Sequence, residues 1–532
     1  MHLRGLIIIA FCFQFFEMYA QSVSKADALM SDYKYSEAIV ELKPLVDKGN
    51  IQAIRKIAEC YRKINDYVNA EKYYSIVVVD KNSIPKNYLY YGQMLMNNNK
   101  YEEAQQWFNT FLSSKPNIKD STLATTLLTS CFKNLGEITP NRKVKLYNLE
   151  ILNSVAADFS AVAYGDKIIF TSSRQGKKNS FDGQSFAQVY IASIKTDSQY
   201  IVTPLTGTIN SKNFNSGPAS INAQKSKIYY TKNNIQYGDA ISNKKDVVTL
   251  KIFEAKFDGI NAKDFSEMAF NDAEYSCAYP AINKEGDLIY YTSDRAGGFG
   301  GKDIYYSTLK DGKWTKPKNA GNVINTPGDE KFPFVHDDGT LYFSSNGHQG
   351  LGGLDIYRVI TNDSGRVTNI INLGLPFNSS SDDFGYFLDS NYHKGFISSD
   401  RIKGKGSDDI YAFEYEAIPF VLQVFSDTIS IDSAMICLNN KSKRDTFYTN
   451  NLGYVNIELL PNSFYKINIE KDSFIAKELN IKTSDIYKPI TKKINLKIKD
   501  ESIKIDVPIE QEINTIAKEP IQIIEEVKPD EQ

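Results

Sequence analysis

The sequence predicts a multidomain protein of class α plus all-β, in which a helical-repeat array precedes a five-bladed β-propeller and a small β-sandwich. Three observations carry this prediction. A helical pattern recurs about every 34 residues near the N-terminus, a strand pattern recurs about every 50 to 60 residues in the middle of the chain, and short alternating strands follow. With 532 residues the chain is long enough for several domains.

The propeller prediction starts from Leu341–Tyr357. In this stretch an apolar strand ends in a Ser pair, a Gly-rich loop follows, and Asp-Ile-Tyr opens the next strand. Copies occupy Ile289–Tyr305 and Gly395–Tyr411, and weaker copies begin at Ile168 and Ile228. Self-similar strand units at such a period are typical of a propeller. The motif residues to which we assign a structural role are Ser293, Ser345, Ser399, Gly301, Gly353, Asp303, Asp355 and Asp409.

A second marker repeats in phase with the first. An Asn followed by Ser, Thr or Asp occurs at Asn153, Asn210, Asn271, Asn325 and Asn378. Seven to nine residues later come Ala161, Pro218, Pro280, Pro333 and Gly385, which we expect to open a short inner strand, where proline removes no ladder donor. Each repeat then reads as four strands, and five repeats over residues 144–416 give five blades. Six blades are the alternative.

The ends of the propeller predict how it closes. The last repeat has no outer strand of its own, because Ile418-Pro419 leads directly into the next domain, whereas Lys145–Leu152 has outer-strand character. An open edge would leave backbone groups unpaired. We therefore expect Lys145–Leu152 to pair beside Ile410–Tyr415.

The Gly-rich loops allow two interpretations. Their glycines permit positive φ in tight turns, and Asp303, Asp355 and Asp409 can accept hydrogen bonds from the backbone N–H groups of these loops. Carboxylates beside glycines could also bind Ca²⁺, but each copy offers one well-placed Asp rather than a dense ligand set. We expect turn capping, and we assign no metal or cofactor site.

Residues 21–137 carry the helical repeat. Tyr-x-x-Ala occurs three times, ending at Ala38, Ala70 and Ala104, and small residues such as Gly92 stand twelve positions before each Ala. These four small residues would let antiparallel helices approach closely. The pattern resembles tetratricopeptide repeats, which implies either a groove for a protein partner or a spacer packed on the propeller.

Residues 419–485 read as short alternating strands separated by turns, which predicts a small β-sandwich. The run Ala434–Leu438, the Gly453 turn and Tyr465 resemble the carboxypeptidase-regulatory-like module, which is non-catalytic. Residues 486–532 are rich in Lys, Glu and Ile and contain four prolines, so we expect a flexible tail.

The first twenty residues read as a secretory signal peptide, with Arg4, an apolar run from Leu6 to Phe16, and Ala20 before the cleavage point. We therefore expect an exported, periplasmic protein. The net charge of -2 argues against a nucleic-acid partner. The four cysteines that follow the predicted signal peptide lie in three separate regions, which favours free thiols over a disulfide framework.

This order of modules resembles the PorE-like, OmpA-family periplasmic proteins of the type IX secretion system. The blocks at 293–305 and 399–411, which open Ser-Asp-Arg and close Asp-Ile-Tyr, carry the resemblance best. It implies association with the outer membrane, through a partner such as a PorP/SprF-like barrel. Such proteins continue into an OmpA-like domain, and no matching block follows Ile486, so we expect no direct peptidoglycan binding.

We assign no catalytic residue from the sequence. No Gly-x-Ser-x-Gly elbow, P-loop or HExxH motif occurs, and His336, His348 and His393 read as loop residues. We expect a non-catalytic scaffold or adaptor. The alternative is a glycan-binding or glycan-hydrolysing propeller protein, which converging carboxyls of raised pKa at the propeller's central mouth would favour.

Overall fold

The computed structural model describes residues 23–132, 143–196, 199–236, 239–440, 443–484 and 486–499. The predicted signal peptide and residues 500–532 of the predicted tail lie outside these ranges. The chain divides into two compact units, of which the first holds the helices and the large β region and the second holds most of the sandwich. None of the described helices combines the length and the apolar character that a membrane span requires.

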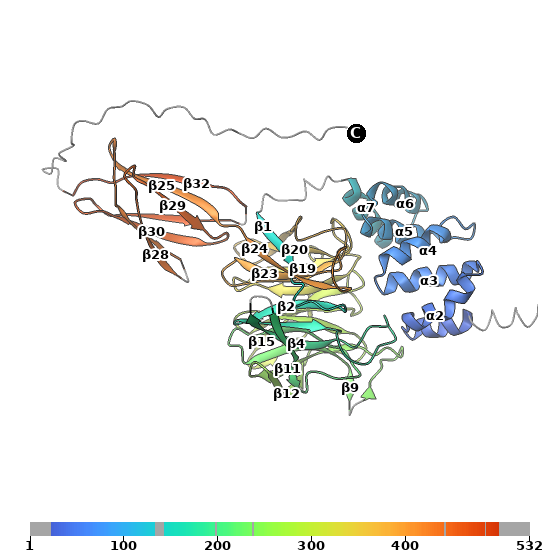
Figure 1. Cartoon of the computed structure of the whole chain (residues 1–532). Coiled ribbons are helices and arrows are strands. Elements are labelled where there is room, and N and C mark those ends of the chain that lie inside the picture. Colours follow the sequence, from blue (N-terminus) through green and yellow to red (C-terminus); the bar gives the residue numbers. More distant parts are fainter. Residues whose placement is uncertain are drawn as a thin grey trace, which may run out of the picture. The chain divides into compact units, whose positions relative to one another are not determined.

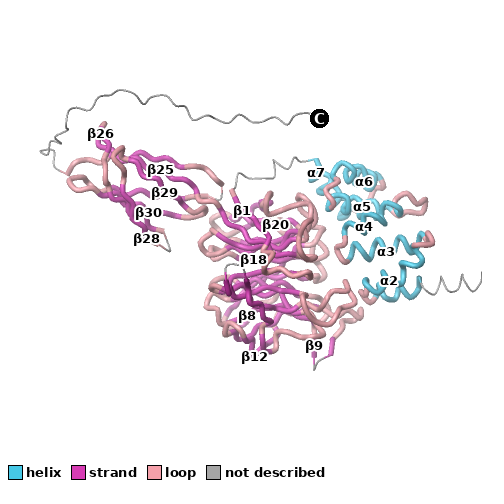
Figure 2. Tube along the Cα trace, viewed as in Figure 1, coloured by secondary structure: helices cyan, strands magenta, loops and turns pink. Residues whose placement is uncertain are grey.

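A helical array opens the first unit (Figures 1 and 2). After a helical segment at 23–31, its complete helices are α2 (Tyr35–Val46), α3 (Ile51–Lys63), α4 (Tyr67–Val77), α5 (Pro85–Asn97), α6 (Tyr101–Ser113) and α7 (Ile118–Phe132). Asn50 and Asp66 cap α3 and α4 by accepting a backbone N–H, and Pro85 begins α5. Each helix packs on the next, so the apolar faces enclose one continuous core.

The four small residues singled out in the array lie inside this core. Ala38, Ala70 and Ala104 are fully buried. A Cβ added to Gly92 would lie 2.7 Å from Cε1 of Phe108, so α5 and α6 approach closely at this point. Small side chains here therefore set the distance between neighbouring helices.

Five antiparallel sheets follow within the described residues. Sheet I contains β2 (Asp158–Tyr164), β3 (Lys167–Ser172), β4 (Gln188–Thr196) and β5 (Gln199–Pro204). Sheet II contains β7 (Ser216–Ile221), β8 (Lys227–Asn233), β11 (Leu250–Phe257) and β12 (Asn261–Glu267), with β6 (Thr206–Gly207) at its edge. Sheet III contains β13 (Cys277–Ile282), β14 (Leu288–Ser293) and β15 (Asp303–Lys310), with β16 (Lys313–Trp314) and β17 (Lys318–Asn319). Sheet IV contains β18 (Glu330–Val335), β19 (Leu341–Ser345), β20 (Asp355–Thr361) and β21 (Val367–Asn372). Sheet V contains β22 (Asp383–Leu388), β23 (Lys394–Ser399), β24 (Asp409–Tyr415) and β1 (Val144–Asn148). A short hairpin, β9 (Ile235–Gln236) and β10 (Asp239–Ala240), extends from sheet II.

The first strands of the five sheets lie against one another in a circle. β2 contacts β7, β7 contacts β13, β13 contacts β18, β18 contacts β22, and β22 contacts β2. The β region is therefore propeller-like. The predicted closure is confirmed in its position and is shorter than expected: β1 pairs with β24, with Val144 opposite Tyr415 and Asn148 opposite Tyr411.

The position predicted for the inner-strand residues is wrong. Each first strand begins two or three residues before the expected Ala, Pro or Gly, and each contains a β-bulge there. The residues in the left-handed region at the bulges, with φ between 49° and 98°, are Ser160, Gly217, Tyr279, Phe332 and Gly385. Because a bulged residue is unpaired, the prolines that follow at 218, 280 and 333 cost no ladder hydrogen bond.

The five Asn markers each join one sheet to the next. Asn378 Oδ1 accepts the backbone N–H of Ile356, and its Nδ2 donates to the C=O of the same residue. Asn325 binds Ile304 and Asn153 binds Ile410 in the same way. Asn210 and Asn271 repeat the arrangement on Val189 and Ile252. We call this arrangement the amide clamp, and it holds each connecting loop against the third strand of the preceding sheet.

The reason proposed for the Gly-rich loops also needs correction. Among the glycines of the two loops at 297–301 and 350–353, only Gly297 has a positive φ. The others allow close approach, since a Cβ on Gly300 would lie 2.1 Å from the Gly328 oxygen and one on Gly352 would lie 1.9 Å from the Ser380 oxygen. These loops are glycine-rich because the backbone of the next sheet passes against them.

The sandwich consists of two four-stranded sheets. One contains β26 (Ile429–Ser430), β25 (Ile418–Ser426), β29 (Tyr454–Leu459) and β32 (Ile490–Asn495), and the other contains β28 (Arg444–Tyr448), β27 (Met435–Asn439), β30 (Phe464–Glu470) and β31 (Lys477–Lys482). The predicted boundary at residue 485 is therefore too early, because β32 pairs with β25. The lysines at 492 and 493 interrupt the alternation of Ile490–Asn495, which hides this strand in the sequence, and Leu496 just after it is buried.

Candidate functional site

In sheets III, IV and V the sequence motif places a Ser of the second strand between the first residue of the first strand and the motif Asp of the third strand. Ser345 pairs with Glu330 on one side and with Asp355 on the other. Ser293 stands likewise between Cys277 and Asp303, and Ser399 between Asp383 and Asp409. All the Gly-rich loops therefore emerge at the same end of the propeller-like region, which we call the motif end.

The helical array binds this motif end. Four side chains of the array donate hydrogen bonds to it: Ser36 Oγ to the Ser180 oxygen at 2.8 Å, Tyr67 Oη to Asp382 Oδ2 at 2.7 Å, Tyr101 Oη to the Leu351 oxygen at 2.6 Å, and Lys119 Nζ to the Gly300 oxygen at 3.3 Å. In the other direction, the Gly350 N–H donates to Ser130 Oγ of the array at 3.2 Å. The two Gly-rich loops at 297–301 and 350–353 thus contact the array directly. Their glycines leave backbone carbonyls uncovered for the tyrosine and lysine donors.

A ring of five equivalent hydrogen bonds surrounds the motif end of the central channel. In each, the backbone N–H of the residue before the first strand donates to the side chain of the residue that follows the Ser pair or its counterpart. The pairs are Ala157 with Ser173, Asn215 with Asn233, Ser276 with Asp294, Asp329 with Asn346, and Asp382 with Asp400, at 2.7 to 3.0 Å. We call these ten residues the mouth ring. Its geometry is constant, whereas its side chains differ from sheet to sheet.

Aromatic rings fill the channel below the mouth ring. Tyr279 stacks on Phe332 at 4.2 Å between ring centroids, Phe332 contacts Phe384 at 4.5 Å, and Phe384 contacts Phe159 at 6.1 Å. The cavity beside these rings is only about 50 Å³, and a further cavity of about 450 Å³ lies at the other ends of the inner strands. A ligand at this end would therefore meet the mouth ring and an aromatic floor.

Two adjoining cavities lie between the array and the motif end. The first has a volume of about 570 Å³ and the second about 420 Å³. Tyr33, Phe181 and Lys302 line both cavities, so the two form one continuous groove. The first volume lies within the range of small-molecule sites, about 300–1,000 Å³.

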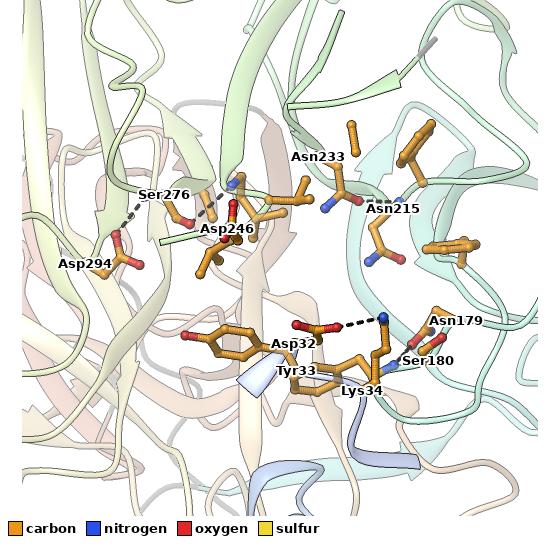
Figure 3. A pocket seen from close by; sticks show the side chains of 18 of the residues that line it. Asp32, Tyr33, Lys34, Asn179, Ser180, Asn215, Asn233, Asp246, Ser276 and Asp294 are labelled. Carbon is orange, nitrogen blue, oxygen red and sulfur yellow. Dashed lines mark hydrogen bonds and ion pairs between the residues drawn. The ribbon is translucent and has the colours of Figure 1, made fainter. Parts of the chain in front are cut away.

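The first cavity combines exposed aromatic rings with amide and carboxyl groups. Tyr33 is 47 % exposed and Phe181 is 42 % exposed. Figure 3 shows Tyr33 on one side of the cavity and Asn215 and Asn233 on the other. Asn215 Oδ1 accepts the Ala187 N–H and Asn233 Oδ1 accepts the Asn215 N–H. Within the described residues, neither side-chain NH₂ group has a hydrogen-bond acceptor, so both can donate to a ligand.

Carboxyl groups complete the first cavity. Asp32 forms an ion pair with Lys34 at 2.9 Å, whereas Asp246 and Asp294 line the opposite wall (Figure 3). Desolvation by the surrounding wall raises the pKa of Asp294, although the Ser276 N–H opposes the shift. The cavity therefore offers acceptors as well as donors.

The second cavity is dominated by cations. Arg62, Lys63, Lys302 and Lys331 line it, against the carboxyls of Asp329 and Asp382. Arg62 is paired with Glu59 at 2.5 Å, and Lys331 is paired with Asp329 at 3.1 Å. Burial opposes ionisation of Asp329, but the charges of Lys331 and Lys302 prevail and lower its pKa to about 2.

A carboxyl cluster lies where α4 meets the mouth ring. Burial raises the pKa of Asp382, and burial together with Asp382 and Asp408 raises that of Asp400 to about 9. Burial, with Asp382 nearby, also raises the pKa of Asp408 to about 7. Such carboxyls were expected of an enzyme. However, Asp382 alone of the three lines the groove, and Leu354 N–H, Tyr67 and Asn65 already donate to its oxygens. The cluster therefore has the bonding of an array-docking contact.

The motif aspartates cap the Gly-rich loops. Asp303 accepts N–H donors from Phe299 and Gly300, and Asp355 accepts the Leu351 N–H. Asp409 accepts the N–H groups of Lys405 and Gly406. Ser293, Ser345 and Ser399 are buried at their strand ends, and a Cβ on Gly301 or Gly353 would collide with Asp329 or Asp382 of the next sheet. The motif residues therefore build the motif end, and of these only Ser293 lines the first cavity.

A buried acid opens the first strand in three sheets, with unequal partners. Asp158 is paired with Arg174 at 2.5 Å in sheet I, and Asp383 is paired with Arg401 in sheet V. In sheet IV Glu330 accepts hydrogen bonds from Thr326 and Ser345, and Gly347 occupies the position at which sheets I and V have Arg174 and Arg401. Burial without a cation raises the pKa of Glu330 to about 8.

The histidines are held in structural contacts. His336 is buried, and its ring nitrogens contact Asp338 Oδ1 and the Asp389 oxygen, each at 3.0 Å. His348 contacts the Ile324 oxygen, and His393 contacts Glu414. None of the three lines either cavity of the groove. No group of three or more His, Cys, Asp or Glu among the described residues could hold a metal ion.

The sequence prediction missed the groove residues because it searched for identity between repeats. The groove includes Lys302 and Leu354, which stand before the motif Asp at a position where the aligned repeats differ, since the third copy has Asp408 there. The mouth-ring positions differ in the same way. Alignment of the five copies followed by a search for in-phase variation would have found them.

Comparison with known proteins reveals distant likeness alone. No protein-family model matches the sequence, and neither does any curated protein. Among solved structures, the chain is similar to hydrazine synthase from Kuenenia stuttgartiensis, with 10 % identity, a TM-score of 0.32, and 69 % of this chain and 72 % of that chain covered. A gluconolactonase from Xanthomonas campestris has 11 % identity, a TM-score of 0.31, and coverage of 53 % and 93 %. A glycosyl hydrolase from Bacteroides ovatus has 12 % identity, a TM-score of 0.31, and coverage of 53 % and 91 %. These values carry no inference about activity.

Proposed function

We propose that the groove binds a carbohydrate chain without cleaving it. The observation that carries this proposal is the first cavity, where exposed Tyr33 and Phe181 accompany unused NH₂ donors of Asn215 and Asn233. Sugar rings present C–H faces that pack on aromatic rings and hydroxyl groups that bond to amides and carboxylates. A groove with this mixture suits an extended polar chain better than a compact apolar ligand.

The proposal favours binding over hydrolysis. A glycosidase needs two carboxyls about 5–5.5 Å or 6.5–9.5 Å apart, one of them acting as an acid. In the first cavity Asp32 is already neutralised by Lys34, and Asp294 accepts the Ser276 N–H. The aromatic floor further supports a surface site, because it leaves no open channel for a deep substrate.

We also propose an architecture for the binding unit. The five sheets and the circle of first strands support a closed five-bladed propeller, and the helix pairs support a tetratricopeptide-like array. The array docks through Tyr67 and Tyr101 on the motif end. Array and propeller would then act together, with the array forming one wall of the site.

A second candidate is a periplasmic scaffold associated with the outer membrane. The docking of the array on the Gly-rich loops supports this reading, since it would present one composite surface to a protein partner. The resemblance to PorE-like proteins adds the expectation of a barrel partner of the PorP/SprF-like kind. Cross-linking in the native envelope followed by mass spectrometry tests it, and recovery of no outer-membrane protein would count against it.

The carbohydrate proposal is tested by calorimetric titration of the full chain with short linear oligosaccharides. We expect binding that weakens about tenfold in Tyr33→Ala and in Phe181→Ala, as loss of an aromatic contact implies. Tyr448→Ala is the matched control, because Tyr448 is 61 % exposed and lies in the sandwich. Reducing ends are measured in parallel, and their release would show hydrolysis. Absence of binding to every oligosaccharide, or equal loss in the control, contradicts the proposal.

A further inference from the structure

We propose that the second cavity is a subsite for an oxyanion, so that the preferred ligand is an acidic saccharide bearing a carboxylate or a sulfate ester. This inference rests on the proposed function for the saccharide, whereas the oxyanion subsite stands on the second cavity alone. Tyr33, Phe181 and Lys302 line both cavities, so one ligand can reach from the first into the second.

The charges of the second cavity are not balanced. Four cations and two carboxyls line this cavity. Arg62 forms an ion pair with Glu59, which does not itself line the cavity. Asp329 serves Lys331 at 3.1 Å. Asp382 is engaged by neutral donors, Tyr67 at 2.7 Å and Asn65 at 3.3 Å. Lys63 and Lys302 therefore remain without a close carboxylate of their own.

The two lysines come from opposite walls. Lys63 ends α3, and its nearest carboxylate oxygen, on Glu59, lies 3.9 Å away while Arg62 holds that carboxylate more closely. Lys302 precedes Asp303 in a Gly-rich loop, and within the described residues its amine has no hydrogen bond or ion pair. Burial and the neighbouring Arg62 lower the pKa of Lys63, while the more distant charges of Glu59 and Asp329 oppose this shift.

Neutral donors surround these cations. Gln93 and Asn97 reach the cavity from α5, and Asn346 reaches it from the mouth ring. Asn346 uses its Oδ1 to accept the Asp329 N–H, which leaves its NH₂ group for a ligand. A carboxylate or sulfate between Lys63 and Lys302 could thus receive charge-assisted and neutral hydrogen bonds together.

The position of Lys302 in the repeats supports a specific role. The equivalent residues before the motif Asp are Leu354 and Asp408, so the fold does not require a cation at this place. The charge of Lys302 opposes the burial-driven rise in the pKa of Asp294 in the first cavity, and together with Lys331 it lowers the pKa of Asp329. It therefore stands at the junction, where an acidic sugar would pass between the cavities.

The experiment compares trigalacturonate with its methyl ester by calorimetric titration of the full chain at low salt. The two trisaccharides share their sugar rings and differ in charge. We expect the acid to bind about tenfold more tightly, a ratio in keeping with one partly shielded charge pair. Galactose 6-sulfate against galacturonate then distinguishes a sulfate ester from a carboxylate.

Variants assign the effect to the subsite. Lys302→Gln and Lys63→Gln should each reduce the preference for the acid at least threefold, and together they should abolish it. Lys310→Gln is the control, because Lys310 ends β15, the strand that begins just after Lys302, and this substitution removes the same charge. Equal binding of acid and ester, or equal loss of preference in Lys310→Gln, would overturn the oxyanion subsite and leave carbohydrate binding intact.

If neither trisaccharide binds, the proposed function is contradicted, and a second experiment then tests the oxyanion subsite alone. Thermal unfolding is then followed in sodium sulfate and in sodium chloride at equal ionic strength. Stabilisation by sulfate in the wild type, lost in the Lys63→Gln/Lys302→Gln double variant and kept in Lys310→Gln, supports the subsite without any saccharide. Equal stabilisation of all three proteins overturns it.

Discussion

The amide clamps and the mouth ring occupy equivalent places in all five repeats, but the clamp residue is the same in every repeat whereas the mouth-ring residues differ. Every clamp uses Asn, and each Asn bonds both backbone groups of one residue in the preceding sheet. The mouth ring keeps its hydrogen bond while its residues vary among Ala, Ser, Asn and Asp. In the clamps, Asn is required because its side chain must bond both a backbone N–H and a backbone C=O. In the mouth ring, one residue of each pair donates only its backbone N–H, and the other needs only a side-chain acceptor.

This difference separates structural from functional positions. A residue repeated in every copy meets a need that every sheet has, such as satisfying a buried N–H and C=O. A residue that differs among copies at the same geometric place is free to serve one ligand. The difference predicts large losses of stability at repeated positions and small ones in the groove.

The largest effect is expected at the buried ion pairs. Arg401→Met would leave Asp383, which is fully buried, without its cation. Breaking such a pair from one side costs about 3–5 kcal/mol. Urea unfolding should show this loss in the free energy of unfolding. Lys394→Met, an exposed cation on the same sheet, is the control. A loss below about 1 kcal/mol would mean that the pair is not a structural requirement of sheet V.

The next effect concerns the clamp itself. Asn378→Ala removes the bonds to the N–H and C=O of Ile356 and leaves both groups buried. We expect a loss of about 3 kcal/mol, from the penalty for unsatisfied buried groups. Asn369→Ala provides the control, since Asn369 is exposed on β21 of the neighbouring sheet. Similar unfolding curves for the two variants would contradict the expectation that the clamp Asn stabilises the protein more than an exposed Asn does.

Glu330 differs from the buried acids Asp158 and Asp383 because no arginine is paired with it, and this difference makes the stability of the protein depend on pH. Its folded-state pKa is raised to about 8, so the native protein keeps a proton that the unfolded chain releases near its ordinary pKa of 4.5. The stability that this proton confers is complete below the unfolded pKa and is lost as pH rises toward 8. The slope is at most about 1.4 kcal/mol per pH unit.

Glu330→Gln tests this sign. The variant cannot ionise, and Thr326 and Ser345 can rotate their hydroxyl groups to accept from the new amide. We expect wild type to lose more stability than the variant between pH 6 and 8, measured by thermal unfolding. Glu150→Gln, an exposed substitution, should follow the wild type. Parallel curves for wild type and Glu330→Gln would mean that Glu330 is ionised in the folded protein.

Sequence reasoning reached the parts of the molecule that repeat. The strand–Gly-loop–Asp unit predicted the propeller-like region, and the missing last strand predicted the pairing of β1 with β24. It misplaced the inner prolines, because a bulge in mid-strand leaves the same sequence pattern as a strand start. It also could not place Lys63 near Lys302, since nothing local in either segment records how the array meets the motif end.

The smallest effect on stability, and the sharpest on function, is expected at Asn233. Asn233→Asp keeps the oxygen that accepts the Asn215 N–H at 2.7 Å and replaces only the NH₂ group that faces the cavity. Because this half-buried position keeps its structural acceptor, the substitution should change the free energy of unfolding by less than about 0.5 kcal/mol. The lost donor and the added negative charge should nevertheless weaken oligosaccharide binding about tenfold, as an unmade hydrogen bond of about 1.5 kcal/mol implies. Asn346→Asp makes the same change in the second cavity, where it should weaken the acidic trisaccharide more than its ester. If Asn233→Asp instead destabilises the protein as much as Asn378→Ala, the mouth ring is structural throughout, and the separation between repeated and varied positions fails.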